Sequence, residues 1–340
     1  MMGLIAWTFL KAVTIGSDSA VQRFPTQQTL NTGDRVAGFA ALDGGFALAT
    51  NATATFDAFF PVSGNVALNG GVILLYEDLY FENLVSFMGT GTISGNGHML
   101  AFSPSQSVLT GTCTTFANVN WELNGDITLL GNCLVLSGNT VVNGNGNLIN
   151  INPTASIQID RGANVLFENV SVRNIHTGQL LCLDTLGTIT FQNAQLVLDG
   201  DYTFTNGHIE VFNQLLITGN GHSFIYTSTQ TSLVWNNATL TLDDSVTFSY
   251  MLTSTTGLTF VDNTSQLFLN NAIFATVAGI AFQKGGLIVD GNSLLTNAGT
   301  GPATSVAFGD GAFSTNNFTI RILPAANLSI QQGYFQYNNL

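Results

Sequence analysis

Charged residues are scarce in this chain, which has 7 Lys and Arg and 20 Asp and Glu among 340 residues. The charged fraction of 8% is about a third of the usual value. Seven scattered cations cannot form the basic face that neutralises nucleic-acid phosphates, so we expect no nucleic-acid partner. Helical bundles and coiled coils are excluded as well, because their outer faces need Glu, Lys and Arg.

Long hydrophobic runs and cysteines are also few. No apolar stretch approaches the roughly 20 residues that span a bilayer, so we expect no transmembrane span. The cysteines Cys113, Cys133 and Cys182 are odd in number and unevenly spaced, unlike a disulfide framework or a zinc signature. We therefore expect small buried hydrophobic residues there, and no metal or other cofactor. The apolar segment 1–11 has its base, Lys11, after the apolar run, which is typical of an export remnant or a hydrophobic cap and not of a complete secretory signal.

Internal repeats are the strongest positive signal. Phe116–Asn147 and Phe191–His222, with an offset of 75 in residue number, are identical at nine of 32 aligned positions. Gly-Asn-Gly occurs at 95–97, 144–146 and 219–221, with offsets of 49 and 75. We interpret these offsets as two and three times a unit of about 24–25 residues, because such periods indicate stacked structural repeats.

Each unit has the pattern of short strands joined by tight turns. In Val165–Ile175 and Leu196–Thr205, apolar residues alternate on either side of Asn or Gly, which is the signature of strands and turns. Three short strands and three turns fill about 24–25 residues, so the sequence predicts an all-β parallel β-helix, or β-solenoid, of roughly 12 coils. We assign residues 1–43 to an N-terminal segment and cap, and residues 44–340 to the β-helix with a C-terminal cap. Uncharged side chains stack well in such a fold, whereas stacked like charges repel.

At Val165–Ile175 and in the Gly-Asn-Gly turns, the sequence resembles the right-handed parallel β-helix superfamily, which includes the pectate-lyase-like folds. Three further stretches, Asn143–Asn147, Leu196–Glu210 and Leu323–Ile330, are similar to uncharacterised β-helix repeat proteins predicted from small-genome, host-associated bacteria. This resemblance implies right-handed coils and a surface or secreted setting, but no particular activity.

Polysaccharide-cleaving enzymes of that superfamily supply the alternative function. Its hydrolases use close carboxylates, a nearby His and an Arg-Ile-Lys element, but here the tripeptide 321–323 is Arg-Ile-Leu. Adjacent strand residues point to opposite faces, so the doublets Glu77-Asp78 and Asp243-Asp244 share a surface only at a turn. We interpret them as solvated turn or strand-end residues, because Asp is common in turns.

The lyases of the superfamily need calcium held by clustered Asp, together with a base. Asp160 and Asp184 lie one unit apart in the sequence, with Arg161 and Arg173 as the nearest bases. A calcium site needs several converging oxygens, which this pair alone does not supply. We assign no catalytic, cofactor-binding or metal residue.

The remaining polar candidates fit the repeat. His98 and His222 each follow Gly-Asn-Gly, so we interpret them as equivalent turn residues five coils apart that cannot share a metal site; the other histidines are His176 and His208. Side-chain amides in the turns are expected to form a hydrogen-bonded ladder, with glycan contact as the alternative, at Asn118, Asn169, Asn193 and Asn237.

Aromatic residues at inward phase are expected in the core, among them Phe167, Phe191, Phe204 and Phe248. Trp121 and Trp235 replace aliphatic strand residues, and an exposed Trp there would stack on a sugar ring.

These features favour a non-enzymatic structural or surface protein: a rigid rod for adhesion, an envelope layer or a fibre. The alternatives are a polysaccharide lyase or hydrolase and a glycan-binding module on the same fold. Open sheet ends need caps or a partner, so we expect self-association, such as end-to-end assembly, or contact with cell-surface glycans. The N-terminal segment and residues 333–337 are the candidate caps or joints. We expect an extracellular or cell-surface location.

Overall fold

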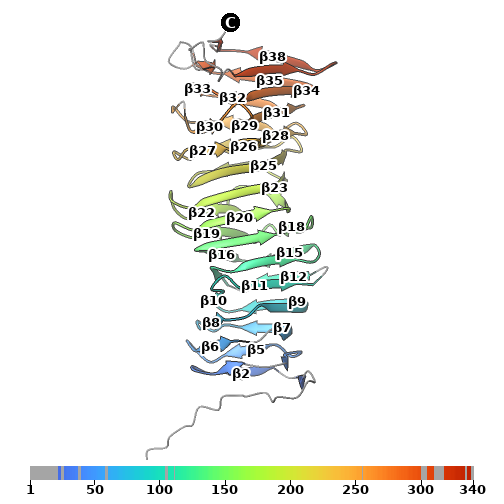
Figure 1. Cartoon of the computed structure of the whole chain (residues 1–340), viewed down its shortest axis with the longest axis vertical. Coiled ribbons are helices and arrows are strands. Elements are labelled where there is room, and N and C mark those ends of the chain that lie inside the picture. Colours follow the sequence, from blue (N-terminus) through green and yellow to red (C-terminus); the bar gives the residue numbers. More distant parts are fainter. Residues whose placement is uncertain are drawn as a thin grey trace, which may run out of the picture.

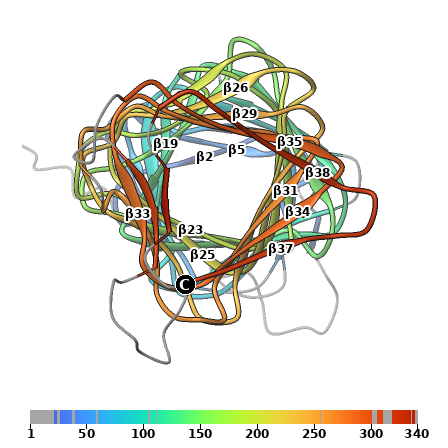
Figure 2. The same cartoon turned by 90° about the horizontal axis from the view of Figure 1, so that it is seen from above.

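The structure is a computed structural model that describes residues 22–23, 27–36, 40–57, 60–103, 106–110, 112–254, 256–299, 305–309, 318–333 and 335–337. Among these residues there is no helix, and parallel strands stack into a β-solenoid with about 23 residues per turn. Figure 1 shows the strands lying across a long rod, and Figure 2 shows the turns overlying one another about a common axis. The prediction of an all-β parallel β-helix is confirmed.

Each turn crosses three faces, which we number in chain order. The first face contains β2 (Gln28–Leu30), β5 (Phe46–Leu48), the second halves of β7 (Phe60–Ala67) and β9 (Leu79–Met88), β12 (Gln106–Thr110), β15 (Ile127–Gly131), β18 (Leu148–Ile151), β21 (Ser171–Ile175), the second halves of β23 (Thr188–Leu198) and β25 (His208–Thr218), β28 (Thr239–Asp243), β31 (Gln266–Asn270), β34 (Gly286–Asp290) and β37 (Thr319–Ile322).

The second face contains β3 (Arg35–Val36), β6 (Thr53–Phe56), β8 (Val72–Leu75), β10 (Gly91–Ser94), β13 (Thr114–Ala117), β16 (Cys133–Ser137), β19 (Ser156–Ile159), β22 (Leu180–Cys182), β24 (Tyr202–Phe204), β26 (Ser223–Tyr226), β29 (Thr247–Tyr250), β32 (Ile273–Thr276), β35 (Asn292–Asn297) and β38 (Asn327–Gln331).

The third face contains β1 (Gln22–Arg23), β4 (Ala40–Ala41), the first halves of β7 and β9, β11 (Met99–Phe102), β14 (Asn120–Leu123), β17 (Asn139–Asn143), β20 (Asn164–Glu168), the first halves of β23 and β25, β27 (Ser232–Val234), β30 (Leu258–Phe260), β33 (Ile280–Phe282), β36 (Val306–Phe308) and β39 (Phe335–Tyr337). The first corner joins the first face to the second, the second corner joins the second to the third, and the third corner leads into the next turn.

The turn length of about 23 residues is slightly shorter than the 24–25 expected, and this changes the meaning of the long internal repeat. Three whole turns lead from Phe116 through Leu136 and Ile159 to Cys182, which are register partners on the second face. These three turns advance the residue number by 66, whereas the offset of 75 leads to Phe191 on the third face. The interpretation of that offset as three coils is therefore wrong, because the repeat relates strands on different faces.

The Gly-Asn-Gly turns lie on three different corners for the same reason: 95–97 on the second, 144–146 on the third and 219–221 on the first. In the second of them, Asn145 and Gly146 have φ angles of 51° and 84°, which favour Asn and Gly. Asn145 Nδ2 donates to the Leu123 carbonyl of the turn below at 3.2 Å.

The first glycine of each Gly-Asn-Gly turn is needed for close packing. A Cβ on Gly144 would lie 2.5 Å from the Cβ of Val170 in the turn above. The corresponding distances are 2.6 Å from Gly95 to Val119 and 2.4 Å from Gly219 to Val246. The first glycine of the motif therefore lies where adjacent turns pack closely, and the Asn and Gly that follow it have left-handed backbone conformations.

The core is a set of stacked inward side chains. The four phenylalanines that were predicted to point inward are at most 3% exposed, which confirms that prediction. Rings in successive turns stack directly: Phe224, Phe248 and Phe274 have centroid separations of 5.3 Å at each step. Each side chain stacks on its register partners in the turns above and below. Like charges at equivalent positions of adjacent turns would therefore repel, which fits the low charged fraction of the chain.

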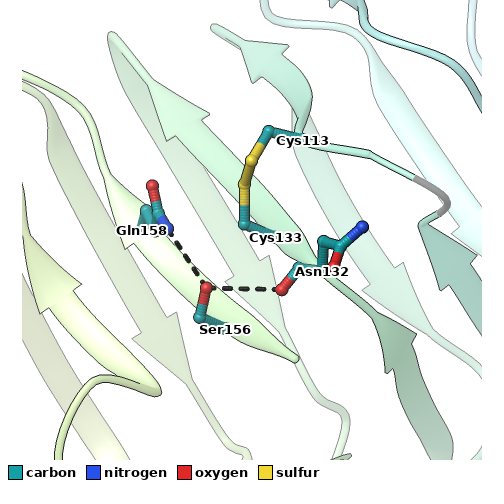
Figure 3. Close-up of a disulfide and its surroundings, with 5 residues drawn as sticks. All are labelled: Cys113, Asn132, Cys133, Ser156 and Gln158. Atoms are coloured by element: carbon teal, nitrogen blue, oxygen red, sulfur yellow. Dashed lines mark hydrogen bonds between the residues drawn. A yellow bond between two sulfur atoms is a disulfide. The ribbon is translucent and has the colours of Figure 1, made fainter. Parts of the chain in front are cut away.

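A disulfide joins two neighbouring turns (Figure 3). Cys113, just before β13, bonds to Cys133 at the start of β16, with their Cα atoms 4.5 Å apart. Beside the pair, Ser156 Oγ accepts a hydrogen bond from Gln158 Nε2 at 3.2 Å. The expectation of three unpaired buried cysteines is wrong for this pair, because a separation of 20 makes one short turn and brings the two positions into disulfide range. It is confirmed for Cys182, which is free and buried.

The two ends differ from the interior of the rod. β2 and β3 already pair in parallel with β5 and β6, while the apolar segment 1–11 lies outside the described residues. At the other end β39 pairs with β36, and Tyr334 of the expected closing segment is outside the described part. The division at residues 43 and 44 stays a prediction. No helix in the described ranges is long and apolar enough to cross a membrane.

Candidate binding groove

The carboxylates that were considered for calcium hold turns together instead. Asp160 and Asp184 lie one turn apart on the second corner. Asp160 Oδ2 accepts a hydrogen bond from Ser137 Oγ at 2.9 Å, and Asp184 Oδ1 accepts three backbone N–H bonds at 3.0 to 3.3 Å. Over the described ranges, no group of three or more His, Cys, Asp or Glu side chains can hold a metal ion.

Other aspartates accept the N–H group that opens a strand in the turn above. The three pairs are Asp78 with Met99 at 2.8 Å, Asp126 with Leu148 at 3.0 Å, and Asp201 with Ser223 at 2.8 Å. In each pair the acceptor lies one turn below a Gly-Asn-Gly turn. These carboxylates are structural partners of the turns and are spread along the rod.

The acidic doublets lie at corners, as the turn interpretation requires. Asp243 Oδ1 accepts the backbone N–H of Asp244 at 2.7 Å and Asn270 Nδ2 at 2.9 Å. Asp244 has a φ angle of 54°. Glu77 is exposed between β8 and β9 on the second corner, far along the rod from Asp243.

The histidines are also dispersed. His98 Nδ1 is 3.5 Å from Asp78 Oδ1 on the second corner, whereas His222 lies on the first corner after β25. The interpretation of these two as equivalent sites a whole number of coils apart is therefore wrong, although their local turns are alike. The rings of His176 and His208 contact backbone carbonyl groups through Nδ1 at 3.1 and 3.0 Å.

An uncharged groove follows the third corner through four consecutive turns. At each turn an asparagine has a φ angle between 49° and 56°: Asn169, Asn193, Asn213 and Asn237. Asn193 Nδ2 donates to Asn169 Oδ1 at 3.2 Å, so the predicted amide ladder is confirmed for these two. Asn118 belongs to the second corner, where its Oδ1 accepts the N–H of Asn139 at 3.0 Å.

Two adjoining hollows of about 320 and 500 Å³ form the groove, and Asn193 and Gln214 line both of them. Within the described chain, the lining consists of amide, hydroxyl and apolar groups with no charged side chain: Gly146, Asn169, Val170, Ser171, Asn193, Ala194, Gln195, Asn213, Gln214, Leu216, Asn237, Thr239, Thr241 and Phe268.

Part of the groove is held in place by side-chain hydrogen bonds across turns. Ser171 Oγ donates to Gln195 Oε1 at 3.1 Å, and Gln195 Nε2 donates to Thr218 Oγ1 at 3.0 Å. Gln214 is exposed, and its amide, like those of Asn213 and Asn237, has no side-chain hydrogen bond to the described residues. The groove therefore combines fixed polar groups with amides that are free to meet a ligand.

Two stacked aromatic side chains lie on the third face, near Asn213 and Asn237 in the sequence, although neither lines the hollows. Phe212 and Trp235 are half-buried, and their rings stack at a centroid distance of 5.3 Å with planes 17° apart. Trp121, the other tryptophan considered for sugar contact, is instead 2% exposed and packs against Phe102 and Phe116 in the core.

A charged group lies one turn above Asn237 on the same corner. Hydrogen bonds from the Thr264 side chain and backbone hold the pKa of Asp262 below its usual value of 3.8. Thr264 Oγ1 in turn accepts the backbone N–H of Asn237 at 2.6 Å. The uncharged stretch thus ends at a carboxylate that stays ionised at neutral pH.

Most of the groove was not predicted from the sequence. Asn169, Asn193 and Asn237 were identified as turn residues, but Asn213 and Gln214 were not. The sequence signal that would have found Asn213 is an apolar strand residue two positions before an asparagine, as in Val211 and Asn213. The residue numbers of Asn193 and Asn213 differ by only 20, so a fixed period of 24–25 passes over the second of them.

The fold thus defines the chain as a parallel β-solenoid with an uncharged lateral groove. No protein-family model, no curated protein and no solved structure matches the chain.

Proposed function

We propose that this protein is a non-enzymatic surface rod that holds an uncharged polysaccharide in the groove along its third corner. The observation that carries the proposal is the lining of that groove, in which amides and hydroxyls repeat from turn to turn without a charged side chain. Such a rod would serve adhesion or form part of an envelope layer.

The dimensions of the groove favour a long ligand. Four stacked turns, spaced about 4.8 Å apart, span about 14 Å along the axis. Amides both donate and accept hydrogen bonds, as do the hydroxyl groups of a sugar. The stacked pair of Phe212 and Trp235 adds an apolar surface on the adjoining third face, which favours a polymer with polar edges and apolar faces.

The use of the carboxylates supports a non-enzymatic role. Hydrolysis of a glycosidic bond needs two carboxyl groups placed across it, while here Asp78, Asp126, Asp184 and Asp201 accept backbone N–H groups of the turns. The parallel β-solenoid architecture also supports a relationship with the right-handed parallel β-helix superfamily, which we include in the proposal.

The disulfide supports an extracellular or cell-surface location. Disulfides persist in oxidising compartments and are rare in the cytosol. The bond from Cys113 to Cys133 joins consecutive turns, where it would keep a rod from opening outside the cell.

The test is affinity electrophoresis in gels that contain a neutral β-glucan, a neutral mannan or the acidic polymer polygalacturonate. We expect retardation by a neutral polymer and none by polygalacturonate. The double variant Asn213→Asp and Gln214→Glu keeps the shapes of both side chains, but it removes donors and adds negative charge. It should weaken binding about tenfold, as the loss of one or two hydrogen bonds implies.

Gln158→Glu is the matched control, because Gln158 is a half-exposed amide on the second face whose partner is a serine hydroxyl. It should bind as the wild type does. Equal binding by the groove variant, or retention by polygalacturonate alone, would overturn the proposal. Release of reducing ends from any of the three polymers would favour the enzyme alternative.

A further inference from the structure

The last described turn of the rod exposes side chains that belong to the core. Ile320, Ile322 and Ile330 are register partners of Leu287, Val289 and Leu295. Those three partners are at most 1% exposed, whereas the isoleucines are 38%, 51% and 53% exposed. The apolar stacks therefore end at the last described turn, and Figure 1 shows β38 of that turn at the end of the rod.

The backbone of this turn is open as well. Within the described ranges, β37, β38 and β39 pair with β34, β35 and β36 below them and with no strand above. An exposed flat strand is normally protected by a charge, a proline or a bulge. β38, with the sequence Asn-Leu-Ser-Ile-Gln, has none of these.

The opposite end of the rod is different. Leu30 and Val36, the inward residues of β2 and β3, are only 6% and 5% exposed. The first turn therefore does not offer a bare apolar surface to the last turn of another copy. A head-to-tail joint would therefore not bring two exposed apolar surfaces together.

The last turn also carries little charge. The whole chain carries 20 Asp and Glu and a net charge of −13, but Arg321 is the only charged residue between positions 311 and 340. Two copies can therefore meet at this end without bringing Asp or Glu side chains together.

We propose that the C-terminal ends of two copies dock on each other through a two-fold axis perpendicular to the rod. The contact is isologous, so the same isoleucines are covered on both copies. With the axis through the second face, β38 of one copy runs antiparallel to β38 of the other, and the two solenoids form one longer rod. This inference is independent of the polysaccharide groove.

Light scattering after size-exclusion chromatography tests the proposal on the full chain. We expect the wild type at tens of micromolar to have twice the chain mass of 36.0 kDa. Ile330→Lys and Ile322→Lys should each give a folded monomer with a cooperative thermal transition, because both side chains are about half exposed in a single copy. A wild-type monomer would contradict the proposal.

Ile225→Lys is the matched control, since Ile225 is a half-exposed, outward isoleucine of β26 on the second face in the middle of the rod. It should leave the dimer intact. Negative-stain images should show rods twice the monomer length. Open-ended filaments, or a dimer that both end variants leave intact, would overturn the two-fold contact.

Discussion

At the scale of single residues, the turns explain why Gly, Asn and Asp recur at the corners of the rod. Gly, Asn and Asp at the corners each have a separate physical task. The first glycine of a Gly-Asn-Gly turn makes room for a valine of the next turn, the asparagine bonds to the turn below, and an aspartate accepts the N–H of the following strand. These corner residues therefore hold adjacent turns together.

Two glycines of one turn should differ in how strongly the same substitution destabilises the fold. Gly144→Asn places a Cβ 2.5 Å from Val170 Cβ and should lower the free energy of unfolding by about 1–3 kcal/mol, as overpacking does. Gly146→Asn meets open space and keeps a φ of 84° near the region that Asn tolerates, so it should cost under about 1 kcal/mol. Urea denaturation of both variants measures the difference, and equal losses would contradict the packing argument.

At the scale of strands and their connections, the pairing of adjacent turns is the dominant interaction. The sequence could predict strand character, because alternation depends only on near neighbours in the chain. It could not predict which strands are partners, since corner lengths vary: the residue number advances by 20 from Phe116 to its partner Leu136, and by 23 from Leu136 to Ile159. For the same reason the disulfide and the groove were missed, because both depend on what lies one turn away.

The disulfide should contribute measurably to stability at this scale. The bond closes a loop with a sequence separation of 20 and so lowers the conformational entropy of the unfolded chain. In the chain-entropy account this raises the free energy of unfolding by about 3 kcal/mol. Cys113→Ser, at an exposed position, should therefore lower the urea midpoint and abolish its sensitivity to a reductant. If the wild type has the same midpoint with and without reductant, the bond does not stabilise the fold.

At the scale of the whole molecule, one continuous core runs the length of the described rod and contains a few buried acidic groups. Burial raises the pKa of the Cys182 thiol from 9.0 to about 12, with a smaller contribution from Asp184. Burial likewise raises the pKa of Tyr226 from 10.0 to about 12, against the hydrogen bond from Ser232. Both groups stay neutral in the fold over a range of pH where the unfolded chain loses their protons.

The stability of the rod should consequently decline in alkali. Between about pH 9 and 12 the unfolded state binds fewer protons than the folded state, so the free energy of unfolding falls as pH rises. Urea midpoints from pH 7 to 11 measure this slope, and Cys182→Ala and Tyr226→Phe should each flatten it. Phe224→Leu, a core change without a titratable group, should lower stability equally at every pH. A slope that neither of the first two variants alters would refute this account.

The division of each turn into three faces has a consequence for how such a chain tolerates insertions and deletions. The asparagines of the groove remain aligned although their residue numbers advance by unequal steps of 24, 20 and 24, because every turn has the same number of strands. Loop length can therefore drift without moving a side chain around the axis. Gain or loss of a single strand-and-turn unit would instead rotate everything beyond it by one face and break the groove into two segments that point in different directions.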